Sequence, residues 1–168
     1  MIRLLGLVLI VLCGTCTGFA LSTDLSARVR MLEDTIGMLR CILEELRYTL
    51  APMERLIGSV ASMERYAKLE FLQSCNVLMR RGAPFPQAWQ QSLSENAAQL
   101  TKEEAGIIAS LSQVLGAADA GAQEAAVSHT VLLLEDRLRT AREGRDAHSR
   151  MYRALGFLGG LALAVALF

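Results

Sequence analysis

The stretch from residue 25 to residue 50 reads LSARVRMLEDTIGMLRCILEELRYTL, and it decides the fold of this chain. Apolar residues recur in it at alternating spacings of four and three: Leu25, Val29, Leu32, Ile36, Leu39, Leu43, Leu46 and Leu50. An unbroken repeat of this kind is typical of one long helix that packs along a partner helix. The helix is expected to end before Pro52, because the residue preceding a proline leaves the helical region.

The expected partner helix lies near the other end of the chain. Its apolar seam repeats the same spacing at Val127, Val131, Leu134, Leu138 and Ala141. The seam follows a predicted turn over residues 117–121 and loses its apolar character towards Arg145 and His148. We therefore expect a helix that begins near Ala122, continues to the end of the chain and packs antiparallel to the first long helix.

Shorter helices are expected between the two long ones, over residues 52–63, 64–81, 87–99 and 101–115. Gly82 and Gly116 are placed to end the second and the fourth of these. Thr101 and Glu104 have the spacing of a capping box, which predicts a helix start. Ala, Leu, Glu, Arg and Met dominate the composition and proline occurs three times, so the predicted fold class is all-α.

Both ends of the chain are strongly apolar. Leu4–Leu21 contains eighteen residues without a charge, and Ala154–Phe168 contains fifteen, preceded by Tyr152 and Arg153 at a predicted membrane interface. The chain as a whole is 52% hydrophobic. We therefore predict two transmembrane helices, residues 1–23 and 154–168, which anchor an antiparallel helical bundle formed by residues 24–153.

Basic residues predict the orientation of the bundle. They flank the apolar ends on the inner side: Arg28, Arg30, Arg137, Arg139, Arg142, Arg145, Arg150 and Arg153. Only Arg3 lies outside them, so the positive-inside rule places the bundle in the cytosol. In an alternative reading, a signal peptide is cleaved after Gly18-Phe19-Ala20, which would leave a secreted helical protein. The apolar run continues through Leu21, which favours retention of the segment.

The sequence contains little that points to chemistry. Cys13 and Cys16 have the spacing of a thiol redox pair, but both lie within the predicted membrane helix, where packing is the favoured role. A membrane thiol oxidoreductase stays an alternative that requires both thiols to reach water. His129 and His148 have no metal-ligating residue at a suitable spacing, and no phosphate-binding loop or nucleophile motif occurs. We predict no catalytic, cofactor or metal site, and no enzymatic activity.

Other residues are candidates for packing and docking. Each apolar end contains one G-x-x-x-G motif, Gly14 with Gly18 and Gly156 with Gly160, which would let membrane helices approach closely. Trp89 is expected to anchor the core, with its ring N–H reaching a backbone carbonyl. The turn that carries Gly116, Asp119 and Gln123 is a candidate docking patch, for which an ordinary turn is the alternative. The 17 basic and 17 acidic residues form no long run of one charge, which argues against nucleic-acid binding.

Several of these stretches, in this order, resemble the stage III sporulation protein AB family of endospore-forming bacteria. They are Thr17-Gly18-Phe19, Arg47-Tyr48 with Ala51-Pro52-Met53, Arg81-Gly82, Ala88-Trp89-Gln90-Gln91-Ser92-Leu93, Leu115-Gly116 with Asp119 and Gln123, and Met151 to Gly160. The resemblance covers nearly the whole chain, and its last block is the most specific. Ala51 departs from the family pattern, which usually has Thr there.

The resemblance implies a role beyond what the residues themselves indicate. That family belongs to a channel complex between mother cell and forespore, and its core is similar to the cytoplasmic helical domain of type II secretion F proteins. Gly82 and the segment from Trp89 to Leu93 match part of that domain. Trp89, Leu93 and, at the membrane interface, Tyr152 are predicted to be structural anchors. The implied partners are the secretion-type ATPase of the same operon and other membrane subunits, in the membrane around the forespore. A non-enzymatic adaptor is thus expected; the alternative is a secretion or pilus platform outside sporulation, although such platforms have two helical domains.

Overall fold

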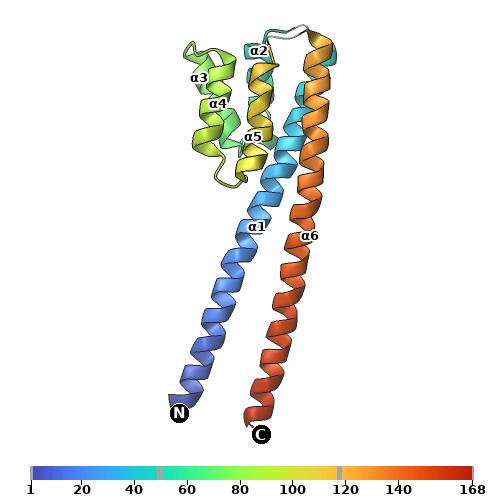
Figure 1. Cartoon of the computed structure of the whole chain (residues 1–168). Helices are drawn as coiled ribbons and strands as arrows, with labels where there is room; N and C mark the ends of the chain where they lie inside the picture. The colour runs from blue at the N-terminus through green and yellow to red at the C-terminus, as the bar shows by residue number, and fades with distance from the viewer. Residues whose placement is uncertain (1, 49–50, 117–118, 168) are drawn as a thin grey trace. The chain divides into compact units, whose positions relative to one another are not determined.

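The computed structural model describes the backbone of residues 2–48, 51–116 and 119–167, and the side chains of residues 25–48, 51–116 and 119–145. Its α-helices are α1 (Ile2–Tyr48), α2 (Met53–Ala61), α3 (Glu70–Arg80), α4 (Phe85–Asn96), α5 (Lys102–Ser110) and α6 (Ala120–Leu167) (Figure 1). Two short 3-10 helices, η1 (Glu64–Tyr66) and η2 (Leu111–Gln113), connect them. No strand occurs in these ranges, so the predicted all-α class is confirmed.

The chain divides into two compact units. One comprises residues 30–139, and the other comprises residues 1–29 together with residues 140–168. The predicted membrane helices, 1–23 and 154–168, are helical over residues 2–23 and 154–167, but their side chains lie outside the described part. Among the residues whose side chains are described, no helix is long and apolar enough to cross a membrane. The predicted boundaries at residues 23 and 154 concern membrane insertion, so they stay predictions.

In the unit formed by residues 30–139, α1 and α6 pack antiparallel. The side chain of Arg40 lies 2.5 Å from Glu135, and that of Arg47 lies 2.6 Å from Glu124. The arginine later in α1, Arg47, pairs with the glutamate earlier in α6, Glu124, so the two helices run in opposite directions. The predicted seams are buried at Leu32, Ile36 and Leu39 on α1 and at Val127, Val131, Leu134 and Leu138 on α6. Leu43 and Leu46, further along the α1 seam, are only half-buried.

A second stripe of α1 is also buried, which the heptad pattern did not predict. It consists of Met31, Thr35, Met38 and Ile42. About a quarter of the circumference away from this stripe, the Sγ atom of Cys41 lies 3.2 Å from the hydroxyl of Tyr66 in η1. Helix α1 is thus covered on one side by α6 and on another by the short segments, and it forms the centre of this unit.

The prediction of one helix over residues 64–81 is wrong for its N-terminal part. The structure has the 3-10 helix η1 there, followed by a break at Leu69 with φ −79° and ψ 85°, before α3 begins. The break turns the buried phenol of Tyr66 towards α1. The amide of Gln73 donates to the carbonyl of Ala61 at 2.9 Å and to that of Tyr66 at 3.3 Å, which also accepts from the backbone N–H of Leu69 at 3.0 Å. Gln73 thus satisfies the carbonyl at the end of α2 and ties α3 to the break.

The other expected helices exist, and their ends differ from the expected ones by no more than three residues. The helix expected over 101–115 divides into α5 and η2, because the last turn tightens to 3-10 geometry. Gly82 and Gly116 adopt φ values of +95° and +85°, the left-handed conformation typical of a residue that ends a helix. Both glycines therefore end helical segments as predicted.

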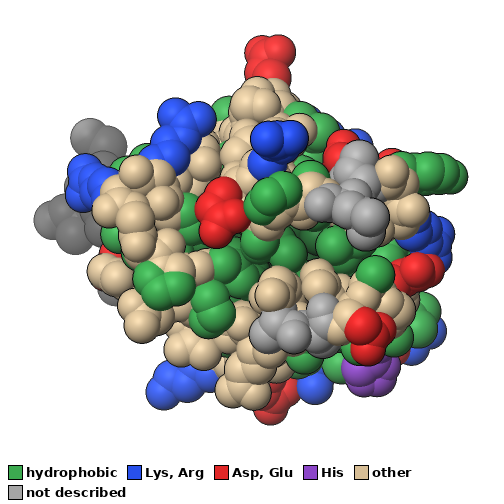
Figure 2. All heavy atoms as spheres, turned by 90° about the horizontal axis from the view of Figure 1, so that it is seen from above, with side chains coloured by type: hydrophobic (Ala, Val, Ile, Leu, Met, Phe, Trp, Pro, Cys, Tyr) green, Lys and Arg blue, Asp and Glu red, His purple; other side chains and the backbone are tan. Residues whose placement is uncertain are grey.

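The surface carries no concentration of one charge on the face seen from above in Figure 2. Hydrophobic side chains lie at the centre of this face, and acidic and basic side chains are scattered around them.

Candidate interaction surface

Trp89 of α4 fixes α5 in place. Its ring is fully buried, and the ring N–H donates to the carbonyl oxygen of Ile108 in α5 at 2.9 Å. The ring meets Phe71 of α3 edge-on, with centroids 5.7 Å apart, and Leu93 lies buried one turn further along α4. The amide of Gln90 donates to the hydroxyl of Ser112, which ties α4 to η2 as well. These contacts determine which face of α5 points outward.

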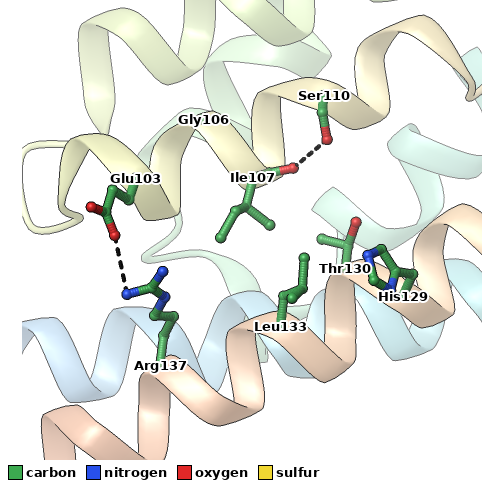
Figure 3. A pocket seen from close by; sticks show the side chains of 8 residues that line it. All are labelled: Glu103, Gly106, Ile107, Ser110, His129, Thr130, Leu133 and Arg137. Atoms are coloured by element: carbon green, nitrogen blue, oxygen red, sulfur yellow. Dashed lines mark hydrogen bonds and ion pairs between the residues drawn. The ribbon is translucent and has the colours of Figure 1, made fainter.

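An open groove runs between that outward face of α5 and α6. Its volume is about 590 Å³, and it is lined by Glu103, Gly106, Ile107, Ser110, His129, Thr130, Leu133 and Arg137. Figure 3 shows Ile107 and Leu133 pointing into it from opposite helices. A Cβ atom built on Gly106 would meet no atom within 4 Å, so this wall of the groove is open. The floor is therefore apolar and accessible.

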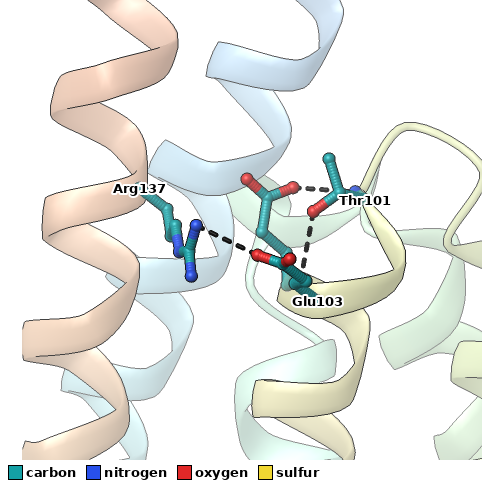
Figure 4. Close-up of polar contacts among 4 residues, drawn as sticks. Thr101, Glu103 and Arg137 are labelled. Carbon is teal, nitrogen blue, oxygen red and sulfur yellow. Dashed lines mark hydrogen bonds and ion pairs between the residues drawn. The ribbon is translucent and has the colours of Figure 1, made fainter.

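One end of the groove is closed by an ion pair. The guanidinium of Arg137 lies 3.0 Å from the carboxylate of Glu103 (Figure 4). The predicted capping box of Thr101 and Glu104 is confirmed, and α5 begins immediately after Thr101. This start places Glu103 in the first turn of α5, opposite Arg137. The Thr101 hydroxyl accepts from the backbone N–H of Glu104 at 3.3 Å, and the Glu104 carboxylate accepts from the N–H of Thr101 at 2.8 Å (Figure 4). The pair neutralises both charges at the mouth of the groove.

The exposed face of α6 beside the groove is uncharged. Its exposed residues, which we call the α6 strip, are Gly121, Ala122, Ala125, His129, Leu132 and Leu133. Leu132 and Leu133 are 63% and 40% exposed, and as sequence neighbours they form an apolar patch at one end of the strip. No charged residue occurs between Glu124 and Glu135, and these two glutamates pair with arginines of α1. The acidic groups of this part of α6 are thus turned towards α1, away from the strip.

The turn predicted as a docking patch has structural roles. Gly116 is exposed, with its positive φ, and residues 117–118 after it are not described. The carboxylate of Asp119 accepts from the backbone N–H of Ala122 at 2.9 Å, so Asp119 is the N-cap of α6. The backbone N–H of Gln123 donates to the carbonyl of Asp119 at 3.0 Å. Docking at this turn stays a prediction.

The remaining predicted packing residues lie outside the described side chains. They are Gly14, Gly18, Gly156, Gly160 and Tyr152, all in the helical ends of the chain. The same holds for Cys13 and Cys16.

The described residues offer little reactive chemistry. No group of three or more His, Cys, Asp and Glu side chains among them could hold a metal ion. Burial raises the pKa of the Cys75 thiol to about 12, so this thiol is protonated and unreactive at neutral pH. Cys41 is half-buried against the Tyr66 hydroxyl.

The groove and the α6 strip were not predicted, although one signal for them exists in the sequence. Leu132, Leu133 and Leu134 are consecutive in a helix, where each residue is turned by about 100° from the one before it. Three such neighbours cannot all face one core, and in the structure only Leu134 is fully buried.

The comparisons with known proteins agree with one another. Residues 3–168 match the family model described as Stage III sporulation protein AB. The stage III sporulation protein AB of Bacillus subtilis (strain 168) is 25% identical over 170 residues, which cover 99% of this chain and 99% of that protein. A solved structure of a stage III sporulation protein AB shares the fold, with a TM-score of 0.59 and 18% identity, over 70% of this chain and 94% of that one.

Proposed function

The chain belongs to the stage III sporulation protein AB family, and from this premise we propose that it is a non-enzymatic membrane subunit of a sporulation assembly between mother cell and forespore. In this proposal residues 30–139 lie in the cytosol and act as an adaptor or platform for a secretion-type ATPase of the same operon. The family membership favours this role over a pilus or secretion platform outside sporulation.

The observation that carries the proposal is the kind of surface that residues 30–139 present. The groove between α5 and α6 is open, its floor is apolar, and its charged residues Glu103 and Arg137 neutralise each other. Small-molecule sites usually enclose most of their ligand, whereas this groove is open along its length. Docking surfaces between proteins combine an apolar centre with a polar rim. The arrangement supports a protein that holds partners together.

Two features support the membrane location within this proposal. Residues 2–23 and 154–167 are helical, and the sequences of both contain long uncharged apolar runs. The glycine pairs Gly14 with Gly18 and Gly156 with Gly160 would allow these helices to pack closely on each other or on other membrane subunits.

Cysteine accessibility in intact cells tests this topology. Single cysteines at Thr23, at Gln99 and after the last residue of an otherwise cysteine-free chain serve as probes; Gln99 is exposed, whereas its neighbour Leu100 is buried. We expect the Gln99→Cys probe to be shielded from a membrane-impermeant reagent and the C-terminal probe to react. Lysed cells provide the control, since the probe at residue 99 should react there. Labelling of this probe in intact cells would place the bundle outside the cytosol and exclude the ATPase contact.

The proposed ATPase contact at the turn can be tested by a change that keeps the cap of α6. Asp119→Asn retains a side-chain oxygen for the N–H of Ala122 and removes the charge, whereas a lysine would also remove the cap. Retention of the ATPase in a pull-down should fall by roughly threefold, as expected for an interfacial charge at the rim. Glu95→Gln, at an exposed carboxylate of α4, is the matched control. Equal retention by all three chains would exclude Asp119 from the contact.

A further inference from the structure

We infer that the α6 strip is a docking site for a second copy of this chain, with the two α6 helices antiparallel about a two-fold axis that passes between Ala125 and His129 of the two copies, at the level of Val127 along the helix. This inference goes beyond the proposed function, and it requires neither the ATPase nor the membrane location.

The strip has two ends of different size. Gly121 and Ala122 at one end are small, and Leu132 and Leu133 at the other are large and exposed. The middle is formed by Ala125 and His129. Over these three and a half turns, the exposed face contains no charge, because Glu124 and Glu135 lie against the arginines of α1. The surface that packs on this face should also be uncharged, and it should present large side chains opposite Gly121 and Ala122.

A second copy has that shape. When two identical helices pack antiparallel about this axis, the turn with Leu132 and Leu133 faces the turn with Gly121 and Ala122 of the other copy. The same symmetry operation repeats this contact at the other end, as in any isologous interface. Large side chains thus enter the spaces left by small ones, which is the condition for close helix packing. A parallel pair would instead set leucines against leucines and leave a gap beside the glycines.

The charges at the ends of the strip agree with the antiparallel pairing. Arg137 lies one turn beyond Leu133, on the groove side, and Asp119 lies just before Gly121. In the antiparallel pair these two residues come to the same end and the same edge, so Arg137, which lies 3.0 Å from Glu103 of its own chain, can also pair with Asp119 of the other copy. The contact is short for a protein interface, so we expect association that is weak in dilute solution. Covalent trapping is therefore the suitable readout.

Disulfide trapping between two variants of the full chain tests both the contact and its direction. Cys13, Cys16, Cys41 and Cys75 are replaced by alanine, and Ala122→Cys and Leu133→Cys are introduced into separate chains. Mild oxidation of the mixture in detergent should yield at least about fivefold more dimer than either chain alone, because a disulfide requires Cα atoms within about 7 Å of each other. Equal or higher yields from Leu133→Cys alone would overturn the antiparallel pairing, and no trapped dimer would overturn the contact.

A second pair of variants separates the strip from general stickiness. Leu132→Glu, added to both cysteine chains, places a charge in the proposed interface and should lower the trapped dimer by roughly tenfold. Val77→Glu makes the same kind of change at an exposed aliphatic residue of α3 and should leave the yield unchanged. Both positions are exposed, so neither variant is expected to unfold the bundle, which a thermal unfolding curve checks. Equal yields from the two variants would show that the strip is not the contact.

Discussion

Thr35 occupies a fully buried position in the second buried stripe of α1, between Met31 and Met38. Its hydroxyl oxygen has no hydrogen-bond partner in the part of the chain that the structure describes. A buried hydroxyl without a partner costs free energy, because it has lost its bonds to water. Valine would fill the same buried space with nearly the same shape, but without the hydroxyl oxygen.

Thr35→Val should therefore raise the free energy of unfolding by about 1 kcal/mol, since it removes the desolvation cost and keeps the volume. Urea unfolding followed by circular dichroism measures the change. Ser92→Ala is the control, because the buried Ser92 hydroxyl donates to the carbonyl of Ala88 at 2.6 Å and its loss should not stabilise. A destabilised Thr35→Val variant would show that this hydroxyl is satisfied in solution.

Tyr66 is expected to make the fold less stable at alkaline pH. Burial, together with the hydrogen bond to Cys41, raises the pKa of Tyr66 from 10.0 to about 12. Because the folded pKa is the higher one, the neutral phenol contributes stability that is fully present below pH 10 and is lost as the pH rises towards 12. The loss amounts to something on the order of 2 kcal/mol. Unfolding free energies between pH 8 and pH 12 (a range set by these two pKa values) should show a decline that is smaller in Tyr66→Phe.

At the scale of the elements, two helix glycines have opposite surroundings. A Cβ atom on Gly37 of α1 would lie 3.2 Å from the Tyr66 hydroxyl, whereas one on Gly106 of α5 would meet nothing within 4 Å. Gly37 thus allows η1 to approach α1, and Gly106 is a weak point in the helix that borders the groove. The break between η1 and α3 belongs to the same arrangement, since it directs Tyr66 towards Gly37 and Cys41.

Gly106→Ala should raise the free energy of unfolding by roughly 0.5–1 kcal/mol, the gain in helix propensity. Gly37→Ala should lower it, because the added Cβ would lie 3.2 Å from the hydroxyl of the buried Tyr66 and force this side chain to shift. Thermal or urea unfolding of the two variants side by side measures both signs. A gain for both would mean that the contact between η1 and α1 is looser than the structure has it.

At the scale of the whole molecule, two kinds of contact join α1 and α6 within residues 30–139: exposed ion pairs and buried apolar contacts. The ion pairs between α1 and α6 are well formed, but their side chains are exposed, at 60% for Arg40 and 49% for Arg47. Exposed ion pairs contribute little, since water screens them and two long side chains must be ordered. The buried apolar contacts of the same helices carry most of the stability.

Combining Arg40→Ala with Arg47→Ala should lower the free energy of unfolding by no more than about 1–2 kcal/mol. Leu39→Ala, at a fully buried position of the same helix, should lower it by about 2–5 kcal/mol. Urea unfolding of the two variants gives the comparison. A larger loss from the arginine changes than from Leu39→Ala would mean that the ion pairs determine the packing of the helices.

The sequence alone predicted the helical class, the antiparallel pair of long helices and most of the helix ends. These features depend on short-range rules: the spacing of Leu32, Ile36 and Leu39, the capping box of Thr101 and Glu104, and the left-handed conformation of Gly82 and Gly116. The burial of Trp89 is a second example, because a single large aromatic residue in a short amphipathic helix has few other places to go.

Only the tertiary structure decided the break before α3, the second buried stripe of α1 and the exposed strip on α6. Each depends on which distant segment lies against a given face. Tyr66 lies in the break, where its side chain packs against Gly37 of α1. Gly37 is 29 residues earlier in the chain, so no local sequence pattern could predict this contact. Leu132 and Leu133 are exposed because a helix can turn only part of its circumference to one core, and that part was already taken by Val131 and Leu134. Spacing along one helix determines that it has an apolar face, whereas the neighbours that cover this face come from elsewhere in the chain.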